Sequence, residues 1–156
     1  MLKKIVGSLA IILLFASCGP KGAESDADEN SIIETSISNL LTNPLDYHGS
    51  IVKIEGMISH VCRTSGDKMR ILQDGSDLTV QIMLGNFTGE FDTDSEGSRI
   101  ELSGKVSTEI TNIEEMEDHE LDDECENTLE AIEAMRARGL DPNIRPHINL
   151  ENYKIK

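Results

Sequence analysis

The amino-acid sequence predicts a mainly β protein, a barrel of five strands with a helical insertion between the fourth and fifth. Five short segments alternate apolar and polar residues and are separated by residues typical of turns. The first segment is the longest and contains Gly56, and a glycine inside a strand often accompanies a bulge or bend. A helical pattern interrupts the series only before the last segment. This order predicts a closed sheet built around one long, bent strand.

The expected strands are residues 51–63, 68–73, 78–84, 99–106 and 147–155. In the third, apolar residues occupy every second position, which is typical of a strand with one buried face. A short amphipathic helix is expected over residues 31–41, before the first strand. A long bent first strand, a connector after the third and a closing fifth strand match the order of an OB-fold barrel.

The helical insertion is expected over about residues 108–141. Residues 114–126 include nine acidic side chains in thirteen positions, which we interpret as a solvated face. Apolar residues nevertheless recur at helical spacing through and beyond this run. They are Leu121, Cys125, Leu129, Ile132 and Met135. The helix is expected to end at Gly139, with Pro142 beyond it, and to carry Cys125 on its buried stripe.

The N-terminus resembles a bacterial lipoprotein signal peptide. Two lysines precede an apolar run at residues 5–15 that is short for a membrane span, and the sequence FASC then ends at Cys18. The resemblance implies that residues 1–17 are removed and that Cys18 carries acyl chains such as palmitate. An uncleaved signal anchor is the alternative. Residues 18–36 are expected to be an acidic flexible tether and residues 37–156 the folded domain.

These features predict a protein of the cell envelope that contacts the membrane through its lipid anchor. Residue 19 is Gly, whereas the inner-membrane retention signal of some bacterial lipoproteins has Asp there, so the outer membrane is the expected location. The formal net charge is −15, from 29 acidic and 14 basic residues, which disfavours binding to nucleic-acid phosphates. Aromatic residues make up only 3% of the chain, so few side chains could stack on bases.

The end of the first strand carries the sharpest candidate site. Strand alternation places His60 and Cys62 on the apolar face, and a four-residue turn at 64–67 would set Cys62 opposite Met69. Such a set suits copper or, less well, zinc, and Cys125 could complete it. A Cys62–Cys125 disulfide is the second alternative, because the envelope is oxidising. Unlinked core residues are the third.

Three stretches also resemble a family of small OB-fold envelope lipoproteins from Bacteroidota-type bacteria. They read LDYHGSIVKIEGMISHVCRTSGDKMRIL, GSRIELSGKVS and HINLENYKIK, within residues 45–106 and 128–156. The family pattern has an HVC-containing first hairpin and a final strand ending in Tyr-x-Ile or Tyr-x-Val. Relatives often have a His shortly after the Cys, where this chain has Thr64 and Ser65. The resemblance implies the fold and the lipid anchor but no established function.

The sequence therefore predicts a lipid-anchored binding module rather than an enzyme. It contains no Gly-rich phosphate loop, nucleophile elbow or HExxH helix. The leading hypothesis is capture of a small ligand or soft metal ion near His60 and Cys62. One alternative is a structural lipoprotein that contacts another envelope protein and is stabilised by the Cys62–Cys125 disulfide. Another is binding of an oligosaccharide or a nucleic acid by the OB face.

Overall fold

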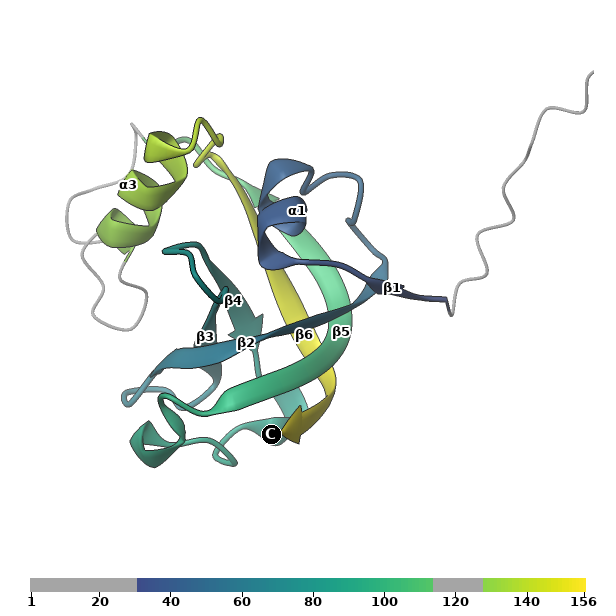
Figure 1. Cartoon of the computed structure of the whole chain (residues 1–156), viewed down its shortest axis with the longest axis vertical. Helices are drawn as coiled ribbons and strands as arrows, with labels where there is room; N and C mark the ends of the chain where they lie inside the picture. The colour runs from purple at the N-terminus through teal and green to yellow at the C-terminus, as the bar shows by residue number, and fades with distance from the viewer. Residues whose placement is uncertain (1–30, 114–127) are drawn as a thin grey trace, which may run out of the picture.

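Five strands close into a barrel in the computed structural model, which describes residues 31–113 and 128–156 (Figure 1). Their order around the barrel is β2, β3, β4, β6 and β5, and β5 pairs again with β2. All neighbours are antiparallel except β4 and β6, which are parallel. The strands are β2 (Ile51–Val61), β3 (Lys68–Leu72), β4 (Thr79–Met83), β5 (Arg99–Ile110) and β6 (Ile144–Ile155). This is the strand order of an OB-fold barrel, so the predicted fold class is confirmed.

Two glycines let strands approach closely across the barrel wall. A Cβ atom at Gly104 of β5 would lie 2.2 Å from the carbonyl oxygen of Asn149, and one at Gly56 would lie 2.5 Å from that of Leu72. Any larger residue would push these backbones apart. The pairing of β5 with β6 also shifts register between Ser103 and Gly104. Glycine at these positions therefore permits the sharp coiling that closes a small barrel.

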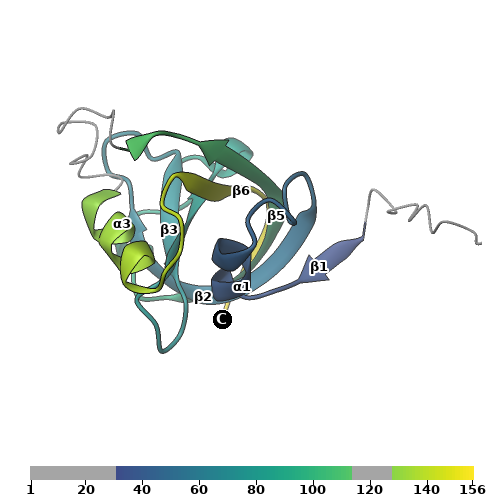
Figure 2. The ribbon, with the colours of Figure 1, turned by 90° about the horizontal axis from the view of Figure 1, so that it is seen from above.

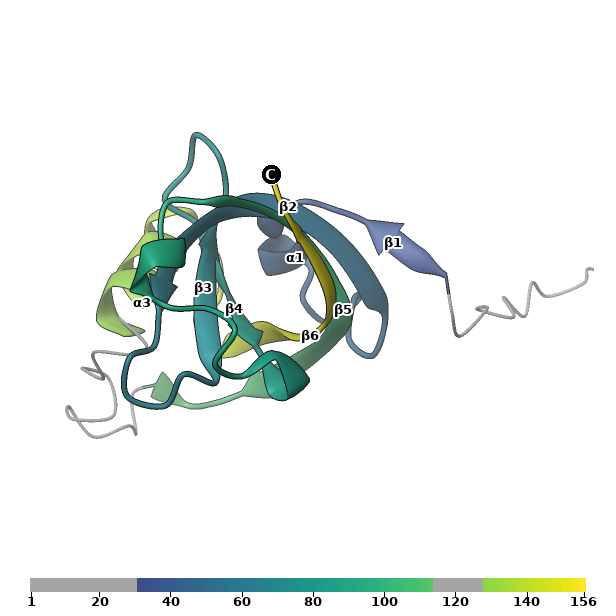
Figure 3. The same cartoon turned by 90° about the horizontal axis from the view of Figure 1, so that it is seen from below.

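The core fills the barrel and is closed at one end by α1 (Ile37–Thr42), as Figure 2 shows. Three apolar residues of α1 are buried against the inward side chains of the strands: Ile37, Leu40 and Leu41. The connectors between β4 and β5, which include η1 (Gly85–Phe87) and η2 (Thr93–Ser95), pass the other end (Figure 3). There the ring of Phe91 lies 4.8 Å from that of Tyr153.

The segment before the barrel differs from the prediction. Residues 31–41 were expected to form one helix, but β1 (Ile32–Glu34) pairs in parallel with the start of β2 before α1 begins. The β-branched residues Ile32 and Ile33 favour a strand. Ser36 then starts the helix, because its hydroxyl oxygen accepts a hydrogen bond from the backbone N–H of Asn39 at 3.1 Å. The described residues 31–36, which fall within the predicted tether at 18–36, therefore include the strand β1.

The insertion contributes α3 (Thr128–Ala137), which packs on the outside of the barrel (Figure 1). Ile132 and Met135 are buried as predicted, but Leu129 is 45% exposed and is not part of the buried stripe. The helix ends where predicted, since Gly139 adopts a positive φ of 71° and its N–H bonds to the carbonyl of Arg136. Cys125 and the acidic run at 114–126 lie outside the described residues. On either side of the insertion, β5 ends later and β6 begins earlier than predicted.

The predicted signal peptide and Cys18 also lie outside the described residues. Among the helices that the structure describes, none has the length and apolar character needed to cross a membrane.

Candidate functional site

A β-bulge at Ser59 decides which side chains of β2 face outward. Ile58 pairs with Ile71, whereas His60 pairs with Arg70, so Ser59 is the extra residue. Its hydroxyl donates a hydrogen bond to the carbonyl of Arg70 at 3.1 Å. Beyond the bulge the alternation is reversed, and Val61 becomes a buried core residue in place of His60.

The bulge corrects two predictions about the His-Cys site. Met69 pairs with Val61 and not with Cys62, and His60 leaves the apolar face on which it was expected. Cys62 borders a pocket with Arg63 and Phe91, while His60 borders a different one. The bulge moves His60 off the apolar face, because an extra residue sends every later side chain to the opposite face. Cys62 lies beyond the end of β2 at Val61, so strand alternation does not place it with His60.

The described residues therefore do not assemble the predicted set of soft-metal ligands. Cys62 is 2% exposed and is bonded as a disulfide, so it offers no thiolate, and Met69 lies in the core. In the part of the chain that the structure describes, no group of three or more His, Cys, Asp or Glu side chains could hold a metal ion. The disulfide partner is not among the described residues. The Cys62–Cys125 pairing stays a prediction, because Cys125 lies outside them.

The outer face of the sheet carries a row of polar side chains across four strands. His60 of β2 pairs with Arg70 of β3, Arg70 pairs with Gln81 of β4, and Gln81 pairs with His147 of β6. Paired residues share a face, so the four side chains lie side by side. With adjacent strands about 4.8 Å apart, the row is about 14 Å long.

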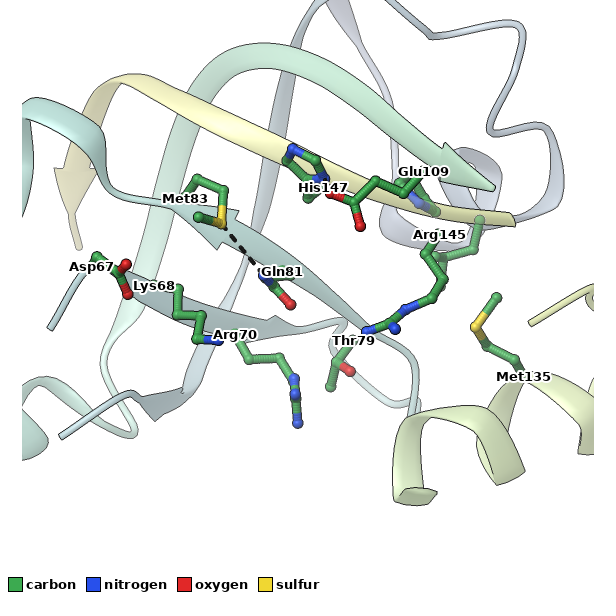
Figure 4. Close-up of a pocket in the computed structure, with 12 residues that line it drawn as sticks. Asp67, Lys68, Arg70, Thr79, Gln81, Met83, Glu109, Met135, Arg145 and His147 are labelled. Atoms are coloured by element: carbon green, nitrogen blue, oxygen red, sulfur yellow. Dashed lines mark hydrogen bonds and ion pairs between the residues drawn. The ribbon is translucent and has the colours of Figure 1, made fainter. Parts of the chain in front are cut away.

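A cavity of about 290 Å³ lies over this row and beside α3 (Figure 4). Lys68 and Arg70 lie on one side of Gln81, with Arg145 and His147 on the other. We call these five residues the cationic groove. Leu41, Met83 and Met135 add apolar surface. Two carboxylates also line the cavity, Asp67 and Glu109, and Figure 4 shows Glu109 between His147 and Arg145. A second pocket of about 400 Å³ shares Arg70 and Thr79 with the first and includes His60, so the two form one concave face.

The cationic groove is partly buried and its charges are engaged. Arg70 is only 9% exposed, and a guanidinium so deeply placed requires polar partners. Lys68, Arg70 and Arg145 each take part in a further interaction in the structure. The Nδ1 atom of His147 lies 3.8 Å from Glu109 Oε1. These contacts hold the groove in shape, and an anionic ligand would share or replace some of them.

His60 stands at the far end of the row with one nitrogen oriented and the other unpartnered. Its Nδ1 lies 3.5 Å from Glu96 Oε1, which also accepts a hydrogen bond from the Val61 backbone N–H at 3.0 Å. Its Nε2 is buried and has no hydrogen-bond partner within the described part of the chain. Such an atom is unusual, since buried polar groups are normally paired.

A different part of the barrel surface, over β2, β5 and the C-terminus, carries charges that neutralise one another. Lys156 Nζ lies 2.8 Å from Glu55 and 3.1 Å from Glu101, and Lys53 Nζ lies 3.4 Å from Glu101. Hydrogen bonds from Lys156 and Arg99 lower the pKa of Glu55 below its ordinary value, and those from Lys156 and Lys53 lower the pKa of Glu101. Acids and bases alternate over this part of the surface.

Sequence reasoning missed the cationic groove. Lys68 and Arg70 are alternate residues of the strand predicted at 68–73, so the sequence indicated that they share a face. In the strand predicted at 78–84, Gln81 lies on the face opposite the apolar residues. His147 was expected to be a surface residue beside a turn. Which outward residues become neighbours depends on the register between strands, and the β4–β6 register joins segments more than sixty residues apart, so neither segment reveals it alone.

Comparison with known proteins identifies no family and finds only distant structural alignments. No protein-family profile matches the chain, and no curated protein matches it significantly. An aspartyl-tRNA synthetase from Entamoeba histolytica aligns with 99% of this chain and 28% of its own, at 14% identity and a TM-score of 0.49. An aspartyl-tRNA synthetase from Leishmania major Friedlin aligns with 85% and 22%, at 13% identity and 0.44. The chain spans less than a third of the length of either.

Proposed function

We propose that this protein is a binding module for a small anionic ligand, which it holds in the cationic groove. The observation that carries the proposal is the convergence of Lys68, Arg70 and Arg145 with His147 over one cavity in a chain of net charge −15. In so acidic a protein, positive side chains gathered at a concave site indicate selection for a negative group. Arg is well suited to this task because its planar fork binds carboxylate or phosphate through two parallel hydrogen bonds.

The size of the site supports a small ligand. Pockets for small molecules usually enclose about 300–1,000 Å³, and the two adjoining pockets measure about 290 and 400 Å³. Neither is lined, among the described residues, by a Phe, Tyr or Trp on which a nucleobase could stack. The negative net charge of the chain also repels long polyanions. A small anion bound in the groove lies close to the groove cations, and salt screens charges more distant than the Debye length.

The proposal keeps the predicted setting and moves the predicted site. A lipid anchor at Cys18 would hold the barrel at the envelope membrane, where its ligand would be captured rather than chemically changed. The ligand would bind beside His60, as expected, but on the outer face of β3, β4 and β6 and away from Cys62. Copper and zinc are not part of the proposal, since Cys62 and Met69 do not lie with His60.

The test is a titration of the purified protein with citrate and with inorganic phosphate, followed by ¹H–¹⁵N NMR, with neutral glucose as the ligand control. The Arg70→Gln, Arg145→Gln double variant should bind at least about tenfold more weakly, because charged hydrogen bonds contribute about 1.5–3 kcal/mol each. Arg99→Gln is the matched control: it removes one Arg from the ion pairs with Glu55 and Asp74, away from the groove.

Added salt should weaken binding to the wild-type protein, as screening requires. The proposal is overturned if neither anion shifts the groove resonances, or if Arg99→Gln weakens binding as much as the double variant does.

The structural alternative has one supporting observation, the disulfide state of Cys62. A bridge from Cys62 to Cys125 would join β2 to the insertion that carries α3. Such a disulfide would stabilise the domain and is compatible with ligand binding. A purely structural role becomes the main function only if no ligand binds.

A further inference from the structure

The unpartnered Nε2 atom of His60 points to the chemistry of the ligand. Leaving a buried polar atom without a hydrogen bond costs about 1–3 kcal/mol, and folded proteins rarely do so without a functional reason. His60 lines the second pocket together with Arg70 and Thr79. The residue that carries this atom therefore lines a ligand-sized cavity.

The surroundings of His60 decide what kind of partner is missing. Glu96 faces Nδ1, and a carboxylate can only accept, so we assign the ring proton to Nδ1. Nε2 then carries a lone pair and accepts a hydrogen bond. The side chain is 24% exposed but Nε2 itself is buried, so a ligand would reach this atom only after the ring turns about its Cβ–Cγ bond. The missing partner is a hydrogen-bond donor such as a hydroxyl group.

Resting on the proposed function, we propose that His60 determines specificity by accepting a hydroxyl of the ligand, and that the ligand is an anionic sugar. Arg70 is the direct cross-strand neighbour of His60 and lines the same pocket, so one ligand could offer a negative group to Arg70 and a hydroxyl to His60. A simple anion would satisfy Arg70 but leave Nε2 of His60 unpaired.

The rest of the face is polar, and two carboxylates, Asp77 and Glu130, also line the second pocket. Gln81 follows Arg70 in the row and can donate and accept, and Ser76 and Thr79 add hydroxyls to the second pocket. From His60 to Gln81 the row covers about 10 Å, enough for one ring and part of a second. The negative group can be a carboxylate, as in a sugar acid, or a phosphate, as in a sugar phosphate.

The experiment compares three probes in the ¹H–¹⁵N NMR titration: D-glucuronate, glucose 1-phosphate and cyclohexanecarboxylate. The last has the ring and the carboxylate but no hydroxyl. The wild-type protein should bind at least one sugar about tenfold more tightly than cyclohexanecarboxylate, and the preferred sugar identifies carboxylate or phosphate as the anion. Imidazole ¹⁵N shifts should show a new hydrogen bond at Nε2 of His60 with that sugar alone.

Two variants test whether His60 causes the tighter binding of the sugar relative to cyclohexanecarboxylate. His60→Leu should lose it, reducing sugar affinity about tenfold while leaving cyclohexanecarboxylate binding unchanged. His60→Gln should keep part of it, because its amide oxygen can accept near the position of Nε2. If His60→Leu does not fold, the probe preference and the imidazole shifts of the wild-type protein still decide.

The inference is wrong if the three probes bind equally, if His60→Leu weakens all of them alike, or if citrate and phosphate bind but no sugar does. In each of those cases the cationic groove remains an anion site. If no anion of any kind binds, the proposed function fails together with the inference.

Discussion

Replacing Gly104 by alanine tests whether the barrel closes through close backbone contact. The new Cβ would lie 2.2 Å from the Asn149 carbonyl oxygen, 2.9 Å from its carbonyl carbon and 2.7 Å from the Cγ2 of Ile148. An ordinary carbon–oxygen contact is about 3.3–3.6 Å. β5 and β6 must therefore separate by more than about 1 Å at this point. The nearest atoms belong to the backbone, so no side-chain rotation can relieve the clash.

The expected cost follows from three contributions. Forcing a methyl group into a packed site costs about 1–3 kcal/mol, and weakening one or two backbone hydrogen bonds between β5 and β6 adds about 1 kcal/mol each. The smaller conformational entropy of unfolded alanine returns about 0.4–1 kcal/mol. We expect a net destabilisation of about 2–3 kcal/mol, which lowers Tm by about 8–12 °C for a domain of this size.

The assay is urea unfolding followed by circular dichroism, with thermal unfolding as a second measure. Ser103→Ala is the control, because Ser103 is the adjacent residue of β5, faces outward and should tolerate the change within about 0.5 kcal/mol. If Gly104→Ala unfolds within 1 kcal/mol of the wild-type protein, the strands do not approach as closely as described, and the role assigned to this glycine is wrong.

Three further predictions concern charge, cysteine chemistry and location. Lys156→Gln should lower the urea midpoint of unfolding at pH 7, because Lys156 pairs with Glu55 and Glu101. The folded pKa values of both carboxyls lie below their ordinary 4.5, so the difference in stability between variant and wild type should shrink as the pH falls below 4.5. Unfolding at pH 7 and pH 3 checks this, and an equal difference at both would contradict it. In a chain that starts at residue 19, Cys62 and Cys125 should give no reactive thiol after denaturation without reductant and a mass two daltons below the reduced value; two reactive thiols would disprove the bridge. Expressed in a bacterium, the full chain should incorporate labelled palmitate and sediment with membranes, whereas Cys18→Ala should do neither, and labelling of that variant would move the lipid to another residue.

Much of the barrel was predictable because each strand buries one face. Alternation of apolar residues located all five barrel strands, and turn residues located their ends to within a few positions. Gly139 and the apolar positions Ile132 and Met135 located the end and the buried side of α3. The helix expected over residues 31–41 was wrong in its first half, because parallel pairing with β2 is a long-range interaction that favours a strand at Ile32 and Ile33.

The candidate site was only partly predictable. His60 was identified as a candidate, but its partners were not. The bulge at Ser59 separates it from Met69 and sets it beside Arg70, yet Ser59 itself has no feature that marks a bulge. Its hydroxyl stabilises the bulge by bonding to Arg70, a contact that exists only when β2 and β3 are already paired.

The sequence by itself determined the net charge and predicted the fold class that the structure confirms, because these depend on composition and on patterns within about ten residues. The lipid anchor stays a prediction from the same kind of local pattern. The tertiary structure alone decided where the site lies. The groove residues come from two consecutive strands and from one much later in the chain, and only strand register brings them over one cavity. They are Lys68 and Arg70 of β3, Gln81 of β4, and Arg145 and His147 of β6. A shift of one residue would send each side chain to the opposite face, so the site is a property of the pairing and not of any single segment.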